Sequence, residues 1–185
     1  MRVRITFLRQ AALLVLTAGL ITIPAPASGT SARTDNAATG VTARAAITYR
    51  QIRNRLSGKC LQPWGSGGNG MVVTQRTCDP NNTWQRWFVV TETTGVIRNQ
   101  GSGKCLDEWD ANPSNGQLVL TWDCYGGARG QQWRPVHKDT QYWELRVYHT
   151  DKCLDLAADN RSDGAVIQQW GCNWGYNANQ QWWIG

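Results

Sequence analysis

Short runs of apolar and β-branched residues alternate with turn-forming residues along most of the chain, a pattern that predicts β-strands. Five such runs stand out, at residues 71–75, 84–90, 118–122, 142–148 and 165–170. Three of them follow an Asn-Gly or Asp-Gly pair of the kind that suits a tight turn. No long window shows the 3.6-residue period and the caps of a helix. We therefore expect an all-β protein.

A pattern of cysteine and tryptophan occurs three times, and the third copy is the best preserved. Each copy has a Lys-Cys-Leu sequence, a second cysteine 18 or 19 positions later, and a Gln-x-Trp sequence near its end. Equivalent positions are 45 to 49 residues apart throughout. The markers are Cys60, Cys78 and Trp87 in the first copy, Cys105, Cys124 and Trp133 in the second, and Cys153, Cys172 and Trp182 in the third. One structural unit is therefore repeated in register.

A unit of this length, with roughly four short strands, cannot bury an apolar face alone, so three units must share a core. Closing the units into a barrel also removes exposed sheet edges. We predict one pseudo-threefold domain over residues 47–185, with repeats at about 47–93, 94–139 and 140–185. The periodic residues Trp87, Trp133 and Trp182 are expected in the shared core.

The first 46 residues lack the repeat markers. Three arginines precede an apolar run over residues 11–23, and Ala25-Pro26-Ala27 fits a signal-peptidase site. We predict a secretory signal peptide over residues 1–27, because the run is shorter than the roughly 18 to 20 residues of a spanning helix. A retained membrane anchor is the alternative. Residues 28–46, rich in small and polar residues, are predicted to form a flexible linker to a secreted domain without a membrane span.

Charge changes this picture little. The whole chain carries a formal net charge of +6, but three of its 19 basic residues belong to the predicted signal peptide. The remaining 16 basic and 13 acidic residues leave +3. This charge does not demand a phosphate-rich partner, so we do not expect nucleic-acid binding. We also predict that the protein is a monomer.

The six cysteines are expected to form disulfides, because export places them in an oxidising compartment. Six cysteines allow 15 pairings, but the repeat favours the pairing that treats all copies alike. These pairs are Cys60 with Cys78, Cys105 with Cys124, and Cys153 with Cys172. A zinc site is the rival interpretation, but the chain has no Cys-x-x-Cys sequence and only two histidines, so we predict neither metal nor cofactor.

Three in-phase copies of Cys-Leu-(Asp/Gln), a second cysteine and Gln-x-Trp resemble the R-type lectins, the ricin B-chain-like domains also found as carbohydrate-binding modules on bacterial glycosidases. The resemblance covers residues 47–185. It implies a β-trefoil with one potential shallow sugar pocket per repeat. In this family the aspartate of Cys-Leu-Asp accepts hydrogen bonds from sugar hydroxyls, the aromatic residue two positions before the second cysteine stacks on the ring, and an Asn-Gln pair completes the polar rim.

The third repeat contains the full set. The resemblance makes Asp155 the main acceptor, Trp170 the stacking platform and Asn179 a donor, with Gln180 supporting either Asp155 or the sugar. Strand alternation independently favours the platform, because Trp170 points outward if Ile167 points into the core. Packing of Trp170 under a neighbouring loop is the alternative.

The second repeat contains Asp107, Trp122 and Gln131, but Gly130 stands where the family has asparagine, which predicts a weakened site. Trp109 is expected either to line this pocket or to cover the barrel. The first repeat departs further. Its residues at the acceptor, platform and asparagine positions are Gln62, Arg76 and Trp84, so we expect it to support the fold and bind little.

These observations favour a secreted, non-catalytic lectin for galactose-type or xylose-type glycans on a polysaccharide or cell surface. A small glycosidase is disfavoured, because the sequence supplies no opposed pair of carboxylates and no Gly-x-Ser-x-Gly or His-Glu-x-x-His motif. A trefoil that binds protein, such as the targeting part of a toxin, remains the alternative.

Overall fold

Twelve antiparallel strands, four from each repeat, organise the part of the chain that the computed structural model describes, residues 47–173 and 175–185. They are β1 (Tyr49–Asn54), β2 (Cys60–Pro63), β3 (Met71–Arg76), β4 (Arg86–Phe88), β5 (Arg98–Asn99), β6 (Cys105–Glu108), β7 (Gln117–Trp122), β8 (Trp133–His137), β9 (Trp143–Val147), β10 (Cys153–Leu156), β11 (Ile167–Trp170) and β12 (Trp182–Ile184). The predicted signal peptide and linker lie outside the described residues.

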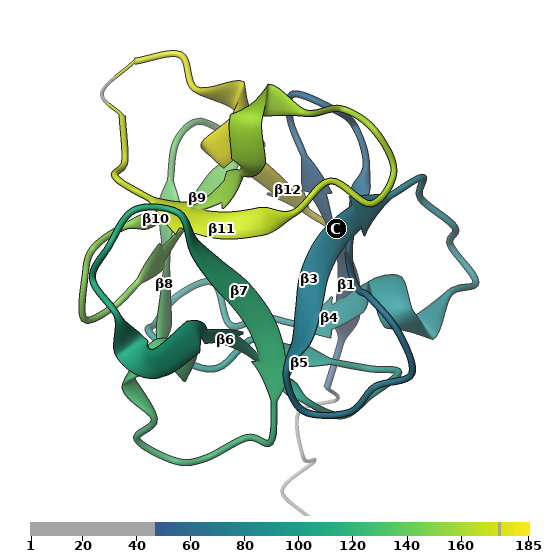
Figure 1. Ribbon diagram of the computed structural model, residues 1–185. Helices are drawn as coiled ribbons and strands as arrows, with labels where there is room; N and C mark the ends of the chain where they lie inside the picture. The colour runs from purple at the N-terminus through teal and green to yellow at the C-terminus, as the bar shows by residue number, and fades with distance from the viewer. Residues whose placement is uncertain (1–46, 174) are drawn as a thin grey trace, which may run out of the picture. The chain divides into compact units, whose positions relative to one another are not determined.

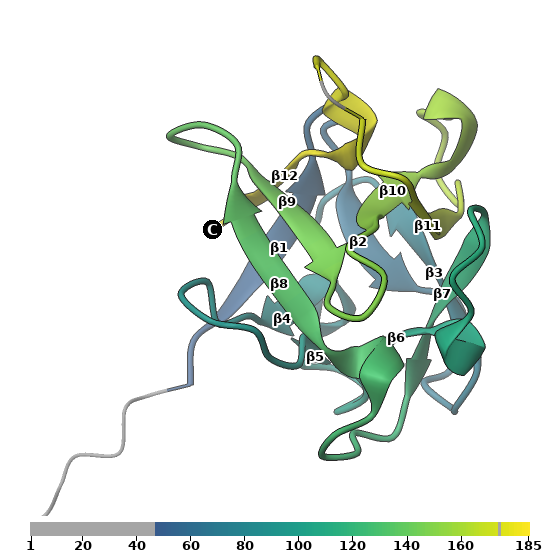
Figure 2. The ribbon, with the colours of Figure 1, turned by 90° about the vertical axis from the view of Figure 1, so that its left-hand side faces the viewer.

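Six of the strands form a barrel and six form three hairpins. In the barrel, β1 pairs with β4 and β12, β4 with β5, and β9 with β8 and β12, while a bridge from Gly95 to Trp133 links β8 to the segment before β5. The hairpins are β2–β3, β6–β7 and β10–β11. Their second strands enclose a triangle, because β7 pairs with β3 and β11 and a bridge from Thr74 to Val166 joins the other two (Figure 1). Figure 2 shows the barrel strands β1, β8, β9 and β12 from the side. This is the β-trefoil that the resemblance implies.

The three periodic tryptophans lie in the core, as predicted. Trp87, Trp133 and Trp182 are at most 1% exposed. The indole N–H of each donates a hydrogen bond to the backbone carbonyl of the leucine that follows the leading cysteine, at 2.9 to 3.0 Å. A buried indole needs such a partner, because an unpaired buried N–H is costly. The bond therefore fixes the first strand of each hairpin against the core.

The predicted disulfide pairing is confirmed. Cys60 bonds to Cys78, Cys105 to Cys124 and Cys153 to Cys172. Each bond joins the start of the first hairpin strand to the residue two positions beyond the second strand. The described residues contain no free cysteine.

One expected strand is shorter than predicted. Residues 84–90 form only β4, because the 3-10 turn η1 (Thr83–Gln85) precedes it. The side chain of Asn82 caps this turn by accepting a hydrogen bond from the backbone N–H of Trp84 at 3.0 Å. A local side-chain cap thus overrides the strand preference of Trp84.

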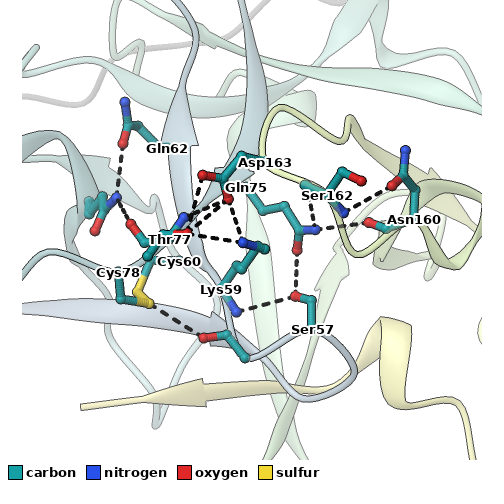
Figure 3. Close-up of polar contacts among 12 residues, drawn as sticks. Ser57, Lys59, Cys60, Gln62, Gln75, Thr77, Cys78, Asn160, Ser162 and Asp163 are labelled. Carbon is teal, nitrogen blue, oxygen red and sulfur yellow. Dashed lines mark hydrogen bonds and ion pairs between the residues drawn. A yellow bond between two sulfur atoms is a disulfide. The ribbon is translucent and has the colours of Figure 1, made fainter.

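Glutamines that project from two of the hairpins hold the loops of neighbouring repeats. The side chain of Gln75 is fully buried, donates to the carbonyls of Asn160 and Ser162, and accepts from the hydroxyl of Ser57 (Figure 3). Gln169 holds residues 112–114 in the same way. Repeat two has Thr121 at this position. The loops that border the hairpins of repeats two and three are therefore fixed by side chains from another repeat.

We predict that Trp87→Phe lowers the free energy of unfolding by about 2 to 4 kcal/mol, because it leaves both a cavity and an unpaired buried carbonyl on Leu61. Chemical denaturation measures this loss. Trp183→Phe, at a partly exposed tryptophan, is the matched control. Equal losses in the two variants would show that the buried hydrogen bond does not hold the hairpin.

Candidate functional site

Three segments of repeat three surround a pocket of about 420 Å³. They are β10 with the following turn η4 (Ala157–Asp159), the end of β11, and the turn η5 (Ala178–Gln180). The lining residues are Asp155, Ala157, Ala158, Asp159, Gln168, Trp170, Asn173 and Asn179. We call this pocket site three. It brings the predicted acceptor, platform and donor together.

Trp170 lies on the outer face of β11. Its side chain is 40% exposed, whereas Ile167, three residues earlier, is fully buried. The alternation of the strand therefore turns the indole outward, as the sequence predicts. An exposed indole beside fixed polar groups suits the apolar C–H face of a sugar.

The carboxylate of Asp155 organises the amides of site three. Its Oδ1 accepts from Gln168, and its Oδ2 accepts from Asn179 and Gln180, each at 2.9 Å. A carboxylate has about four acceptor positions, so these bonds leave one for a ligand. Asp155 is only 3% exposed. Its main effect is therefore to fix the amides of Gln168 and Asn179 at the pocket wall, where their remaining polar atoms lie beside the ligand space.

Gln168 lines site three, although the sequence motifs do not predict it as a site residue. It precedes Trp170 by two positions, so both side chains leave the same face of β11. This two-residue spacing is the feature of the sequence that places Gln168 beside Trp170.

Gln180 lies behind the acceptor, not at the pocket surface. It is 1% exposed, and its amide N–H group also donates to the carbonyl of Gly171 at 3.1 Å. Its carbonyl oxygen accepts from the backbone N–H of Asn173 at 3.1 Å. Of the two roles that the resemblance allows, these contacts match support of Asp155.

The wall opposite the amides contains left-handed backbone. Ala158 and Asp159 have φ values of 52° and 54° in η4. Asp110 and Ala111, at the equivalent positions in repeat two, have 64° and 48°. Such conformations are uncommon for residues other than glycine, and they persist only where surrounding contacts impose them. The glutamine clamps of Gln75 and Gln169 supply such contacts.

Repeat two has a second pocket, site two, of about 320 Å³. It is lined by Asp107, Trp109, Asp110, Ala111, Leu120, Trp122, Tyr125, Ala128, Arg129, Gly130 and Gln131. Asp107 accepts from the buried amide of Gln131 at 2.7 Å. Trp109, Trp122 and Tyr125 are 53%, 38% and 55% exposed. Site two thus has three exposed aromatic side chains, whereas Trp170 is the one aromatic residue among the described residues that line site three.

Two amides of site three have no counterpart in site two. Leu120 replaces Gln168, and Gly130 replaces Asn179. A Cβ at position 130 would lie 2.3 Å from the carbonyl oxygen of Glu108 and 2.7 Å from Oδ1 of Asp107. The turn η3 (Arg129–Gln131) therefore leaves no room for a side chain there. Site two offers more apolar surface and fewer fixed hydrogen-bonding groups.

Repeat one fills its own site. Gln62, at the acceptor position, accepts from Gln85 at 3.0 Å and from Asn82 at 3.3 Å. Arg76, at the platform position, lies over the ring of Trp64 at 4.8 Å. The ring of Trp84 packs against Gly67, where a Cβ would approach it to 2.5 Å. In repeat one, the residues at the acceptor and platform positions therefore contact other side chains of the protein.

Burial raises the pKa of the Asp155 carboxyl, and the hydrogen bonds from Gln168, Gln180 and Asn179 oppose this rise. Burial also raises the pKa of Asp107, against the hydrogen bond from Gln131. Both acceptors therefore hold their protons more tightly than exposed aspartates.

One cluster among the described residues has the composition of a metal site, namely Glu144, Cys153 and Cys172. The two sulfur atoms are bonded to each other, so neither is a thiolate ligand. The carboxylate of Glu144 instead pairs with Lys138 and Arg146. This cluster is a salt bridge beside a disulfide.

The fold and the pockets agree with the comparison to protein families. The model of the family described as ricin-type beta-trefoil lectin domain-like matches residues 38–122, 92–170 and 131–185 in three overlapping segments. The chain belongs to this family of ricin-type β-trefoil lectin-like domains. A search of curated proteins gave no match. No helix within the described residues is long and apolar enough to cross a membrane.

Three solved structures show the range of relatives. The designed threefold-symmetric protein ThreeFoil is 32% identical, with a TM-score of 0.68 over 74% of this chain and 96% of its own. The exo-β-1,3-galactanase 1,3Gal43A from Clostridium thermocellum is 29% identical, with a TM-score of 0.68 over 76% of this chain and 30% of the enzyme. The C-half of the earthworm R-type lectin, solved with GalNAc, is 21% identical and shares the fold, with a TM-score of 0.57 over 74% of this chain and 96% of its own.

We predict that sugar binding at site three weakens in acid. Affinity should stay constant above the raised pKa of Asp155 and fall as the pH drops through it, because the protonated carboxyl loses an acceptor and releases the amides. Calorimetric titration with galactose and xylose between pH 4 and 7, in a Trp122→Ala background, measures this. Circular dichroism checks that the fold persists. Constant affinity down to pH 4 would contradict the role of the carboxylate.

Proposed function

We propose that the protein is a secreted, non-catalytic lectin that binds galactose-type or xylose-type glycans, with site three as the main pocket and site two as the second. The observation that carries the proposal is the convergence in one pocket of an outward indole, Trp170, with amides fixed by Asp155. A sugar needs both an aromatic plate for its C–H face and oriented polar groups for its hydroxyls. The family membership and the lectins among its structural relatives support a carbohydrate partner.

Binding is favoured over catalysis by the state of the carboxylates in site three. A glycosidase uses two carboxyl groups on either side of the scissile bond, one of which donates a proton. Asp155 is buried and engaged by three amides, which leaves it poorly placed to transfer a proton. Asp159 also lines the pocket, but on the exposed turn η4. The pair thus lacks the arrangement of an acid and a base.

Each pocket is open and small, so a single sugar should bind weakly, with a dissociation constant on the order of 1 mM, about −4 kcal/mol. Useful affinity then requires a ligand that engages sites two and three together, since the second contact forms at high effective concentration. We therefore infer that polymeric or branched glycans are the natural ligands.

A glycan array probed with the mature protein and matched variants tests this function. Trp170→Ala should weaken monosaccharide binding at least tenfold, which corresponds to about 1.4 kcal/mol. Trp122→Ala should weaken it less but should also reduce binding to polysaccharide. Trp64→Ala, which changes an exposed indole of repeat one, is the control and should leave binding unchanged.

Two results would contradict the proposal. If wild-type protein bound no glycan, or if it bound no better than the Trp170→Ala/Trp122→Ala double variant, the two pockets would not be sugar-binding sites. Release of reducing sugar from galactan or xylan by wild-type protein, lost in Asp159→Asn, would show an enzyme instead.

A further inference from the structure

A buried polar pair lies beneath site two. Glu108, the residue after the acceptor Asp107, is fully buried at the end of β6. The side chain of His149 is 7% exposed, and its Nε2 lies 3.5 Å from Oε2 of Glu108. In the same register, repeat three has Leu156 after its acceptor, and Leu56 is the counterpart of His149. The corresponding positions are thus apolar in this register, whereas site two has an acid and a histidine.

The imidazole of His149 joins the two walls of site two. Its Nδ1 lies 3.2 Å from the backbone carbonyl oxygen of Arg129, and its Nε2 lies 3.3 Å from that of Ala111. Ala111 belongs to η2 (Trp109–Ala111) and Arg129 to η3, and both residues line the pocket. One ring from repeat three therefore connects the two turns between which a ligand of repeat two must fit.

Each ring nitrogen of His149 faces a backbone carbonyl oxygen, and Nε2 also lies beside the carboxyl group of Glu108. A change in the charge of Glu108 therefore acts on the ring that connects η2 with η3.

The surroundings make the charge of Glu108 sensitive to pH. Burial raises the pKa of Glu108 to about 7, the neighbouring charges of Asp107 and Asp110 add to this rise, and a backbone hydrogen bond from Asn112 opposes it. The charged group on the third element, η3, is Arg129, which lines the pocket with the two aspartates. From β11, the neutral amide of Gln169 donates to Oε1 of Glu108 at 3.4 Å.

We propose that Glu108 and His149 are positioning residues for site two, and that ionisation of the buried Glu108 carboxyl makes sugar binding at site two, but not at site three, depend on pH between about 6 and 8. The pair does not contact the sugar. It sets the distance between η2 and η3, and ionisation of Glu108 at higher pH places a buried charge beside Asp107 and Asp110, which loosens the two walls. The inference rests on the proposed function, because it takes site two to be a sugar pocket.

The test isolates each site. In a Trp170→Ala background, which leaves site two, the affinity for galactose and xylose is measured by calorimetry from pH 5.5 to 8.5. We expect it to fall at least fivefold across this range. In a Trp122→Ala background, which leaves site three, we expect no change over the same range.

The variant Glu108→Leu/His149→Leu, which copies the pair Leu156 and Leu56, provides the matched control. Added to the Trp170→Ala background, it should make the affinity of site two independent of pH. Should this variant not fold, Glu108→Gln gives the same test, because its amide does not ionise. A positioning role predicts a flat pH profile in these variants, which a general loss of stability would not produce.

The pH dependence of folding stability provides a second test. The raised pKa of Glu108 means that the folded protein holds a proton that the unfolded chain releases near pH 4.5. The contribution of Glu108 to stability is therefore greatest below pH 4.5 and is lost as the pH rises to about 7. The melting temperature of wild type should fall relative to Glu108→Gln across that window.

Two results would overturn the inference, and they differ in what they leave standing. If the Trp170→Ala protein bound sugar with the same affinity at every pH, the positioning role would be wrong and site two would still be a sugar pocket. If that protein bound no sugar at any pH, both the positioning role and the sugar pocket at site two would be wrong.

Discussion

One hydrogen bond in each repeat connects the core to the surface. The indole N–H of a buried tryptophan donates to the carbonyl of the leucine that follows the leading cysteine, for example Trp182 to Leu154. The next residue in the chain, Asp155, is the acceptor of site three. Because a buried N–H group demands a partner, the core tryptophan and the acceptor strand cannot move independently. Packing in the barrel thus determines where the polar end of the pocket lies.

This bond occurs in all three repeats, yet the pockets differ. Site three combines an indole with three amides, and site two combines three exposed aromatic residues with a single carboxylate–amide pair. In repeat one, Trp84 packs against Gly67 and Gly101, and Gln62 accepts hydrogen bonds from Gln85 and Asn82. Scaffold and ligand contacts are therefore separable. The core needs all three tryptophans, whereas each surface site is free to change.

Local signals in the sequence predict the scaffold well. The in-phase cysteines and tryptophans predict the repeat and the disulfides, and the two-residue period of a strand predicts that Trp170 points outward. Such local signals do not predict contacts between segments that are distant in the sequence. The saturation of Asp155 by amides and the contact of His149 with two turns of another repeat depend on segments brought together by the barrel. The loop that follows the left-handed residues of η4 is held by Gln75, 83 positions before Ala158.

The central claim is that a sugar stacks on Trp170 while the core tryptophans stay fixed. The indole N–H signals of the ¹⁵N-labelled protein, titrated with galactose and with xylose, test it most directly. The signal of Trp170, assigned by its absence from Trp170→Phe, should shift with sugar concentration and saturate, while that of Trp182 stays in place. If the Trp170 signal does not move with either sugar while signals outside sites two and three do, the sugar binds elsewhere and the account is wrong.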